Sequence, residues 1–326
     1  MLRHFLLVLF ACLWLADARA ADKLPIATWA PSDMPMSVHK VGPHSYYVEG
    51  LLEEASRENE GFIANAGFVI TKDGVVVFDT LGSPALADRL IAEIRKLTEQ
   101  PIRRVIVSHY HADHFYGIPA FRRIGAEIWA DTRAHGYLNS SAASERLDQR
   151  KKIIGPWLGP DFTLPLPDRW LDKPESFSMG DVKFSLRYLG SAHSPEDLTM
   201  LVEPDGVLYS GDIVYAGRVP FIGDADTRLW LGAIDRLLAI PARVMVPGHG
   251  PASMDLKRDG RLTRDYLKFL RQQMGQAAQN FETFDEAYDK VDWSEFSAEP
   301  TFDAANRRNA YNVFLQMEQE MLGTSK

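Results

Sequence analysis

The residues best suited to chemistry lie in one short stretch, IVSHYHADHFYG, at positions 106–117. It places His109, His111, Asp113 and His114 directly after an apolar run at 105–107. Two histidines separated by one residue on a tight turn can point both imidazoles at one ion, and the adjacent Asp113 and His114 can face another. The spacing therefore predicts two neighbouring metal ions.

Four further residues of metal-ligand type follow predicted strands. His193 lies in GSAHSPEDL (190–198), His249 in VPGHG (246–250), Asp212 in LYSGD (208–212) and Asp79 in VVVFDT (75–80). Side chains that follow strands gather at one rim of a sheet, where loops can surround a ligand. We expect these residues to join the first cluster in one site.

The residue types suggest how the metal ions are shared. The predicted ligands are His109, His111 and His193 for one ion, Asp113, His114 and His249 for the second, and Asp212 as the bridge between them. Asp79 is expected to support the ligands, and Asp113 can also shuttle a proton. Imidazole and carboxylate without thiolate suit two zinc ions, and equally iron or manganese. Because metal binding lowers the pKa of water to about 7, a hydroxide bridging two ions is a nucleophile near neutral pH, which predicts hydrolysis.

The surrounding pattern alternates strands and helices. Helices are expected from Pro84 onward, over 228–239 and through most of the chain after Gly250, and the Pro-rich segment 155–172 is expected to form a long loop at the rim of the site. The predicted strands are 45–49, 62–70, 75–79, 102–107, 127–130, 182–189, 198–203, 207–210 and 243–246. Mixed strands covered by helices predict one α/β domain over residues 21–326, with a helical tail from about residue 255.

The first twenty residues have the features of a signal peptide. Arg3 and His4 precede an apolar run at 5–16, and Ala18-Arg19-Ala20 fits the small-x-small cleavage pattern. Cleavage after Ala20 predicts a periplasmic or secreted protein without stable membrane insertion, because the run is short for a bilayer span. A lipoprotein signal at Cys12 is the alternative. Cys12 is the only cysteine, so the cleaved chain can form no disulfide and offer no thiolate.

The charge balance limits the class of partner. The chain has 36 basic and 44 acidic residues and a formal net charge of -8. Removal of residues 1–20 takes away two basic groups and one acidic group, which gives -9. We expect a small-molecule substrate and no nucleic acid, because nucleic-acid binding needs a basic patch and none is visible. The sequence does not predict the oligomeric state.

Four motifs carry a resemblance to a known family. HYHADH, GSAHSPEDL, YSGD and VPGHG, in this order, resemble the successive metal-binding motifs of the metallo-β-lactamase superfamily, over residues 40–255. The resemblance implies a four-layer αββα sandwich with a dinuclear metal centre at the sheet edge. Within the superfamily the pattern is most similar to glyoxalase II-like hydrolases, which carry a bridging aspartate where Asp212 stands. It is also similar to the periplasmic zinc metallohydrolases found with quinoprotein and sulfur-oxidation systems.

The substrate is less constrained than the site, because a fold does not fix a substrate. We expect a small ester, thioester or amide. The aromatic residues expected to line an apolar pocket are Phe115, Tyr116, Trp157 and Phe221. One alternative is a β-lactam hydrolase. Another is a mononuclear-iron persulfide dioxygenase that uses His109, His111 and His193 and leaves the second set empty. A third is a metal-binding protein without catalysis.

Overall fold

The first of two β-sheets comes from the N-terminal half of the chain. The structure, a computed structural model, describes residues 27–323, and the predicted signal peptide lies outside this range. The strands of this sheet are hydrogen-bonded in the order of the chain. They are β1 (Val38–Lys40), β2 (Ser45–Val48), β3 (Ala66–Thr71), β4 (Gly74–Phe78), β5 (Ile102–Ile106), β6 (Glu127–Asp131) and β7 (Arg169–Leu171).

The second sheet comes from the C-terminal half and has the order β12-β11-β10-β9-β8. Its strands are β8 (Glu175–Met179), β9 (Val182–Tyr188), β10 (Leu198–Val202), β11 (Val207–Tyr215) and β12 (Val244–His249). All nine residues of β11 are buried. The strand lies between β10 and β12 and is covered on both faces, which explains why most of its sequence is apolar.

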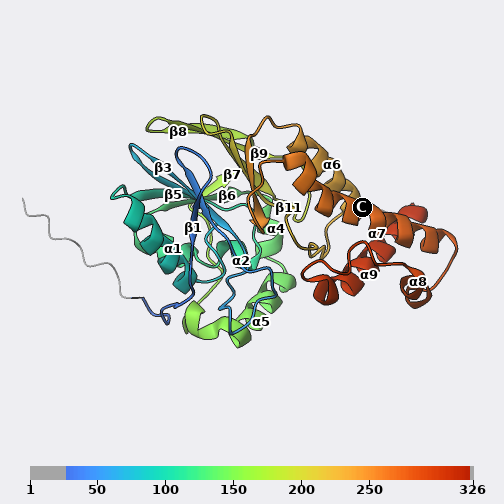
Figure 1. Cartoon of the computed structure of the whole chain (residues 1–326). Coiled ribbons are helices and arrows are strands. Elements are labelled where there is room, and N and C mark those ends of the chain that lie inside the picture. The colour runs from blue at the N-terminus through green and yellow to red at the C-terminus, as the bar shows by residue number, and fades with distance from the viewer. Residues whose placement is uncertain (1–26, 324–326) are drawn as a thin grey trace, which may run out of the picture.

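Helices cover the outer face of each sheet (Figure 1). The helices beside the first sheet are α1 (Pro84–Leu97), α2 (Ala112–Phe115), α3 (Ile118–Arg123), α4 (Ala134–Leu138) and α5 (Ser141–Leu158). Those beside the second sheet are α6 (Thr227–Leu238), α7 (Leu256–Gln279), α8 (Phe284–Lys290) and α9 (Phe302–Met321). Local sequence explains where α1 begins: the hydroxyl of Ser83 accepts a hydrogen bond from Leu86 N, and Pro84 occupies the first turn.

Three layers of apolar side chains hold these elements together. One lies between the first sheet and its helices and includes Val77 and Leu90. A second lies between the two sheets and includes Phe184. The third joins the second sheet to α6, α7 and α9 and includes Trp230 and Leu270. The result is a four-layer αββα sandwich with C-terminal helices, as the sequence predicted.

Strand direction explains where a site can form. β4 runs parallel to β5 in the first sheet, and β11 runs parallel to β12 in the second. The carboxyl ends of parallel neighbours lie at one edge of a sheet, and the loops that follow them can surround a ligand. The predicted metal ligands lie in β11 and β12, in the connection from β5 through α2, and in the loop between β9 and β10.

Several local expectations need correction. The predicted loop at 155–172 is shorter than expected, because α5 continues to Leu158 and β7 begins at Arg169. The short strands β1, β7 and β8 were not predicted. β11 continues to Tyr215, so Asp212 lies inside a strand and does not follow one.

Within residues 27–323, no helix combines the length and the apolar character that are needed to cross a membrane.

Candidate metal centre

The first cluster lies where β5 leads into the short helix α2. His109 and His111 occupy the connection, and Asp113 and His114 lie in α2 itself. The side chains of His109 and His114 are fully buried, whereas His111 and Asp113 are partly exposed. The cluster therefore has a buried side and a side that solvent can reach.

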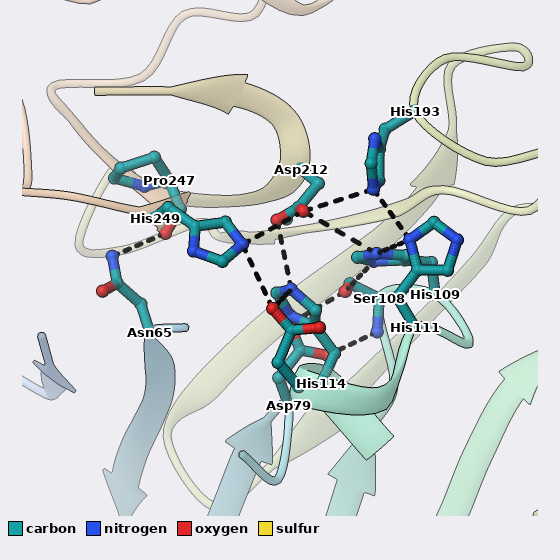
Figure 2. Close-up of polar contacts among 12 residues, drawn as sticks. Asn65, Asp79, Ser108, His109, His111, His114, His193, Asp212, Pro247 and His249 are labelled. Carbon is teal, nitrogen blue, oxygen red and sulfur yellow. Dashed lines mark hydrogen bonds and ion pairs between the residues drawn. The ribbon is translucent and has the colours of Figure 1, made fainter. Parts of the chain in front are cut away.

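Three histidines point nitrogen atoms at a common centre (Figure 2). His111 Nδ1 lies 3.1 Å from His109 Nε2 and 2.7 Å from His193 Nε2. His193 comes from the loop between β9 and β10, in the other half of the sandwich. The ligand atoms of these three residues all lie within 4.8 Å of one another. The predicted first set is thus brought together.

Burial keeps these three imidazoles neutral. It lowers the pKa of His111 to about 3 and that of His193 to about 4, and it lowers the pKa of His109 well below its usual value. The neighbouring histidines lower the pKa further. Neutral imidazole is the form that binds metal ions.

The tautomer of His109 follows from its contacts. Ser108 Oγ donates its proton to Asp79 Oδ2 at 2.8 Å. Because that proton is used, Ser108 Oγ accepts a hydrogen bond from His109 Nδ1 at 2.9 Å. His109 Nε2 then carries a lone pair that faces His111 and His193. Three imidazoles that share one centre have too few protons to satisfy all their short contacts with hydrogen bonds, and a cation at that centre would satisfy them.

The second predicted set also meets in space. The ligand atoms of Asp113, His114 and His249 lie within 4.8 Å of one another. Asp113 Oδ2 lies 3.5 Å from His249 Nε2 and 3.8 Å from His114 Nε2. His249, the last residue of β12, donates from Nδ1 to the carbonyl oxygen of Ile63 at 2.6 Å, which leaves its Nε2 lone pair facing Asp113.

Asp212 lies between the two sets (Figure 2). Its Oδ1 is 3.2 Å from His114 Nε2, and its Oδ2 is 3.2 Å from His249 Nε2 and 3.5 Å from His193 Nε2. Burial alone would raise the pKa of Asp212, but the facing His249 and His114 hold it well below its usual value. The carboxylate is therefore charged and positioned to share one oxygen with each set.

Asp79 positions the cluster through hydrogen bonds to His114 and Ser108. Its Oδ2 accepts a hydrogen bond from His114 Nδ1 at 2.9 Å, and its Oδ1 accepts one from Ser108 N at 2.7 Å. The first contact fixes the tautomer of His114 and directs Nε2 at the site. Asp79 adopts a positive φ of 66°, a strained conformation for a residue other than glycine. These contacts agree with the supporting position expected for Asp79.

The site fits metal ions on the evidence of its own atoms. His114 Nε2 and Asp212 Oδ1 are buried and have no hydrogen-bond partner among the described residues. Buried polar atoms without partners are costly in a folded protein. Burial opposes a charge on His114, but Asp212, Asp79 and Asp113 raise its pKa well above the usual value, so the carboxylates around this nitrogen favour a cation there. Imidazole nitrogens and carboxylate oxygens that converge in this way are a suitable donor set for divalent cations.

Glycine is required where β12 passes the site. A Cβ atom on Gly248 would lie 1.8 Å from Asp212 Oδ1, closer than any side chain tolerates. Asn65 fixes the same turn, because its Nδ2 donates to the carbonyl oxygen of Pro247 at 2.9 Å (Figure 2) and to that of Gly250 at 2.7 Å. The motif VPGHG therefore sets the backbone path as well as supplying His249.

Sequence reasoning missed several polar residues at the site. Tyr215 Oη donates to Asp212 Oδ2 at 2.5 Å, and its ring stacks on His249 with centroids 5.0 Å apart. Glu196 accepts from Tyr110 N at 3.1 Å, and burial raises the pKa of Glu196 to about 7. Asp197 and Arg218 lie close by and are buried. The sequence offered one indication of these residues, the acidic pair Glu196 and Asp197 in SPEDL, which lies three and four residues after His193.

The structure corrects part of the predicted pocket. Phe115 and Tyr116 are fully buried in the core between the first sheet and its helices, so they do not line an open pocket. Helix α2 turns them inward, away from the site. Trp157 and Phe221 are only partly buried, and Phe221 lies 5.1 Å from the Arg218 guanidinium. A substrate contact for these two residues stays a prediction.

The low pKa of His193 predicts an acid-sensitive contribution to stability in the metal-free protein. An unfolded histidine binds a proton near pH 6.5, whereas His193 in the folded chain does so only near pH 4. The unfolded state therefore gains protons first, and the contribution is lost as pH falls through this window. Between pH 6.5 and 4.5, wild type should lose about 2 kcal/mol more unfolding free energy than His193→Gln.

Urea unfolding of both metal-free proteins at the two pH values measures this difference. The comparison with a variant is needed because Glu196, with its pKa raised to about 7, contributes with the opposite sign. Equal losses in the two proteins would show that His193 is not buried as a neutral group.

Comparison with known proteins agrees with this geometry. The sequence profile of the metallo-beta-lactamase superfamily matches residues 59–249, more than half of the chain. The linear primary-alkylsulfatase of Pseudomonas sp. (strain ATCC 19151) is 26% identical over 259 residues, which cover 67% of this chain and 48% of that protein. The chain thus spans about half the length of this relative.

Two metallo-beta-lactamases are also similar. Metallo-beta-lactamase IND-1 of Chryseobacterium indologenes is 22% identical over 193 residues, 58% of this chain and 72% of that protein. The solved structure of a metallo-beta-lactamase from Pontibacter korlensis superposes with a TM-score of 0.57 at 21% identity, over 72% of this chain and 99% of that one. The structural likeness shows the shared fold. The chain belongs to the metallo-beta-lactamase superfamily.

Proposed function

We propose that the chain is an exported, dinuclear metal-dependent hydrolase that acts on a small ester, thioester or amide. One observation carries this proposal: two separate sets of three ligands face each other across the shared carboxylate of Asp212. A site for a single ion would not need the second set of Asp113, His114 and His249. Two zinc ions, when bound, would activate water and polarise the bond that is cleaved.

The residues of the chain have distinct parts in this proposal. His109, His111 and His193 would hold one ion and Asp113, His114 and His249 the other, while Asp79 and Ser108 keep the histidines in the required tautomers. Asp113 is partly exposed, and its charged form is favoured by His114, His249 and Arg150 although burial opposes it. It is therefore the ligand best placed to exchange a proton with a substrate.

A panel of substrates tests the class of reaction. The zinc-loaded protein should hydrolyse at least one of a carboxylic ester, a thioester, a β-lactam and an alkyl sulfate. The β-lactam is included because of the similar metallo-beta-lactamases, and the sulfate because of the similar alkylsulfatase. A protein that is loaded with metal and folded, yet inactive on every member of the panel, would contradict a hydrolase of this class.

Export is the second part of the proposal. When the full chain is expressed with a functional secretion pathway, the exported form should begin at Ala21, because Ala18-Arg19-Ala20 matches the cleavage pattern. The intact mass of protein from the periplasm or medium measures the cleavage site. A retained Met1 or a lipid attached to Cys12 would show that the leader has a different role.

A further inference from the structure

Two arginines, the fully buried Arg218 and the partly buried Arg150, differ from the other arginines of the described chain. Among residues 27–323, the arginines that are not exposed pair with a carboxylate in all but two cases. The paired ones are Arg89, Arg104, Arg123, Arg264 and Arg271. Arg150 and Arg218 have no carboxylate within ion-pair distance in the same part of the chain, and both lie at the candidate metal centre.

Arg218 is fully buried and almost without hydrogen bonds. Its Nη1 lies 3.5 Å from the carbonyl oxygen of Glu53, a long contact, and 3.4 Å from His249 Nδ1. His249 Nδ1 already donates its proton to Ile63, so it cannot accept one from Arg218. Nε and Nη2 of Arg218 are buried and have no partner among the described residues. These two N–H groups lie on the same edge of the guanidinium, which is the geometry that holds two oxygens of an oxyanion.

Arg150 lies on α5, and its charge helps to lower the pKa of Asp113. It is partly buried, its Nε has no partner, and it forms no hydrogen bond or ion pair with any described residue. Burial lowers the pKa of both arginines, and Asp113 is among the groups that oppose this lowering for each. Both cations thus act electrostatically on one candidate metal ligand.

An unpaired buried cation is unfavourable and needs a reason. The effective penalty for burying one charge is several kcal/mol when no partner compensates it. Asp113 and Asp212 cannot supply the compensation once they bind metal, because their charge is then shared with the cations. With metal present the surroundings of both arginines are strongly positive, and an anionic ligand would remove the imbalance.

We propose that Arg150 and Arg218 bind an oxyanion carried by the substrate, so that the preferred substrate is an anionic ester and not a neutral one. This inference rests on the proposed hydrolytic function and narrows its substrate class. Sulfate, phosphate and carboxylate groups share the required chemistry. Arg150 is partly accessible from solvent, whereas Arg218 is fully buried, and its Nη1 would exchange the long contact with the Glu53 carbonyl oxygen for the ligand.

Binding of anions that cannot be hydrolysed tests the proposal apart from catalysis. Isothermal titration of the zinc-loaded full chain uses hexane-1-sulfonate, hexylphosphonate and hexanoate, with hexan-1-ol as the neutral match. At least one anion should bind about tenfold or more tightly than the alcohol, and Arg150→Gln and Arg218→Gln should each weaken that binding about tenfold. Arg264→Gln is the matched control, a partly buried arginine already paired with Asp235, and should bind as wild type does.

Thermal unfolding distinguishes a role of Arg218 in ligand binding from a purely structural role. Arg218→Met removes an unpaired buried cation and keeps a similar shape, so its melting temperature should equal or exceed that of wild type. Anions that bind no better than hexan-1-ol, or equally well to both glutamine variants, would overturn the proposal. A lower melting temperature for Arg218→Met with unchanged anion binding would also overturn it, in favour of a structural arginine. Anion binding without any hydrolysis would contradict only the proposed function.

Discussion

Removal of metal is expected to abolish hydrolysis completely, and added zinc is expected to restore it. The side chains at the centre include three neutral histidines, His109, His111 and His193, which face the charged carboxylate of Asp212. In the proposed reaction they hold and orient the ions, and activation of water and of substrate depends on those ions. The measurement is the rate on the best substrate of the panel, before chelation, after chelation and after reconstitution.

Chelation needs a control for folding. Converging ligands without cations leave buried atoms such as His114 Nε2 and Asp212 Oδ1 unsatisfied, so the metal-free chain should also be less stable. Far-ultraviolet circular dichroism at the assay temperature shows whether it is still folded. Full activity in folded protein that elemental analysis shows to be free of metal would contradict the proposed chemistry.

The second large effect is expected from Asp212→Asn, which should lower turnover by about 10²-fold or more. Changes to residues that only support metal ligands already cost 10–100-fold, and Asp212 contacts both ligand sets directly. The amide keeps the shape but loses the charge and one good donor oxygen. The variant should still fold, because the change is nearly isosteric and leaves the apolar layers untouched.

The Asp212→Asn variant should lose one of the two metal ions more readily than the other. The ion at His109, His111 and His193 has three neutral imidazoles and should be retained, whereas the ion at Asp113, His114 and His249 depends more on the bridge. Tyr215→Phe is the matched control, because it removes only the hydroxyl that donates to Asp212 and leaves the carboxylate in place. Two retained ions with a nearly wild-type rate would show that Asp212 does not bridge, and would remove the best support for a glyoxalase II-like assignment.

The sequence predicted the fold and the residues of the candidate site because the motifs that indicate them are local. HYHADH places four candidate ligands within six positions, and an apolar strand directly before them fixes their place at a sheet edge. His193 and His249 stood out because each follows a strand-like segment and a glycine-containing turn. The distance between the two halves of the sandwich was not predictable from spacing, and only the packing of both sheets brings His193 within 2.7 Å of His111.

Other features depend on tertiary contacts that leave no local pattern. Arg150 lies in the mostly polar stretch 144–152 of α5 and Arg218 lies in a loop, and the adjacent residues do not distinguish either one from a surface arginine. The expected pocket at Phe115 and Tyr116 was wrong because proximity in sequence to ligands does not fix direction, and α2 turns both rings into the core. Strands β1 and β7 are three residues long, too short to show a period of two.

The most direct test of a dinuclear centre is the number of metal atoms per chain in the purified protein. Inductively coupled plasma mass spectrometry on a preparation of known protein concentration gives this number together with the identity of the metal. The proposed function predicts two zinc atoms per chain. One iron atom per chain, retained when His249 is replaced by alanine, would contradict it and favour the mononuclear oxidative alternative.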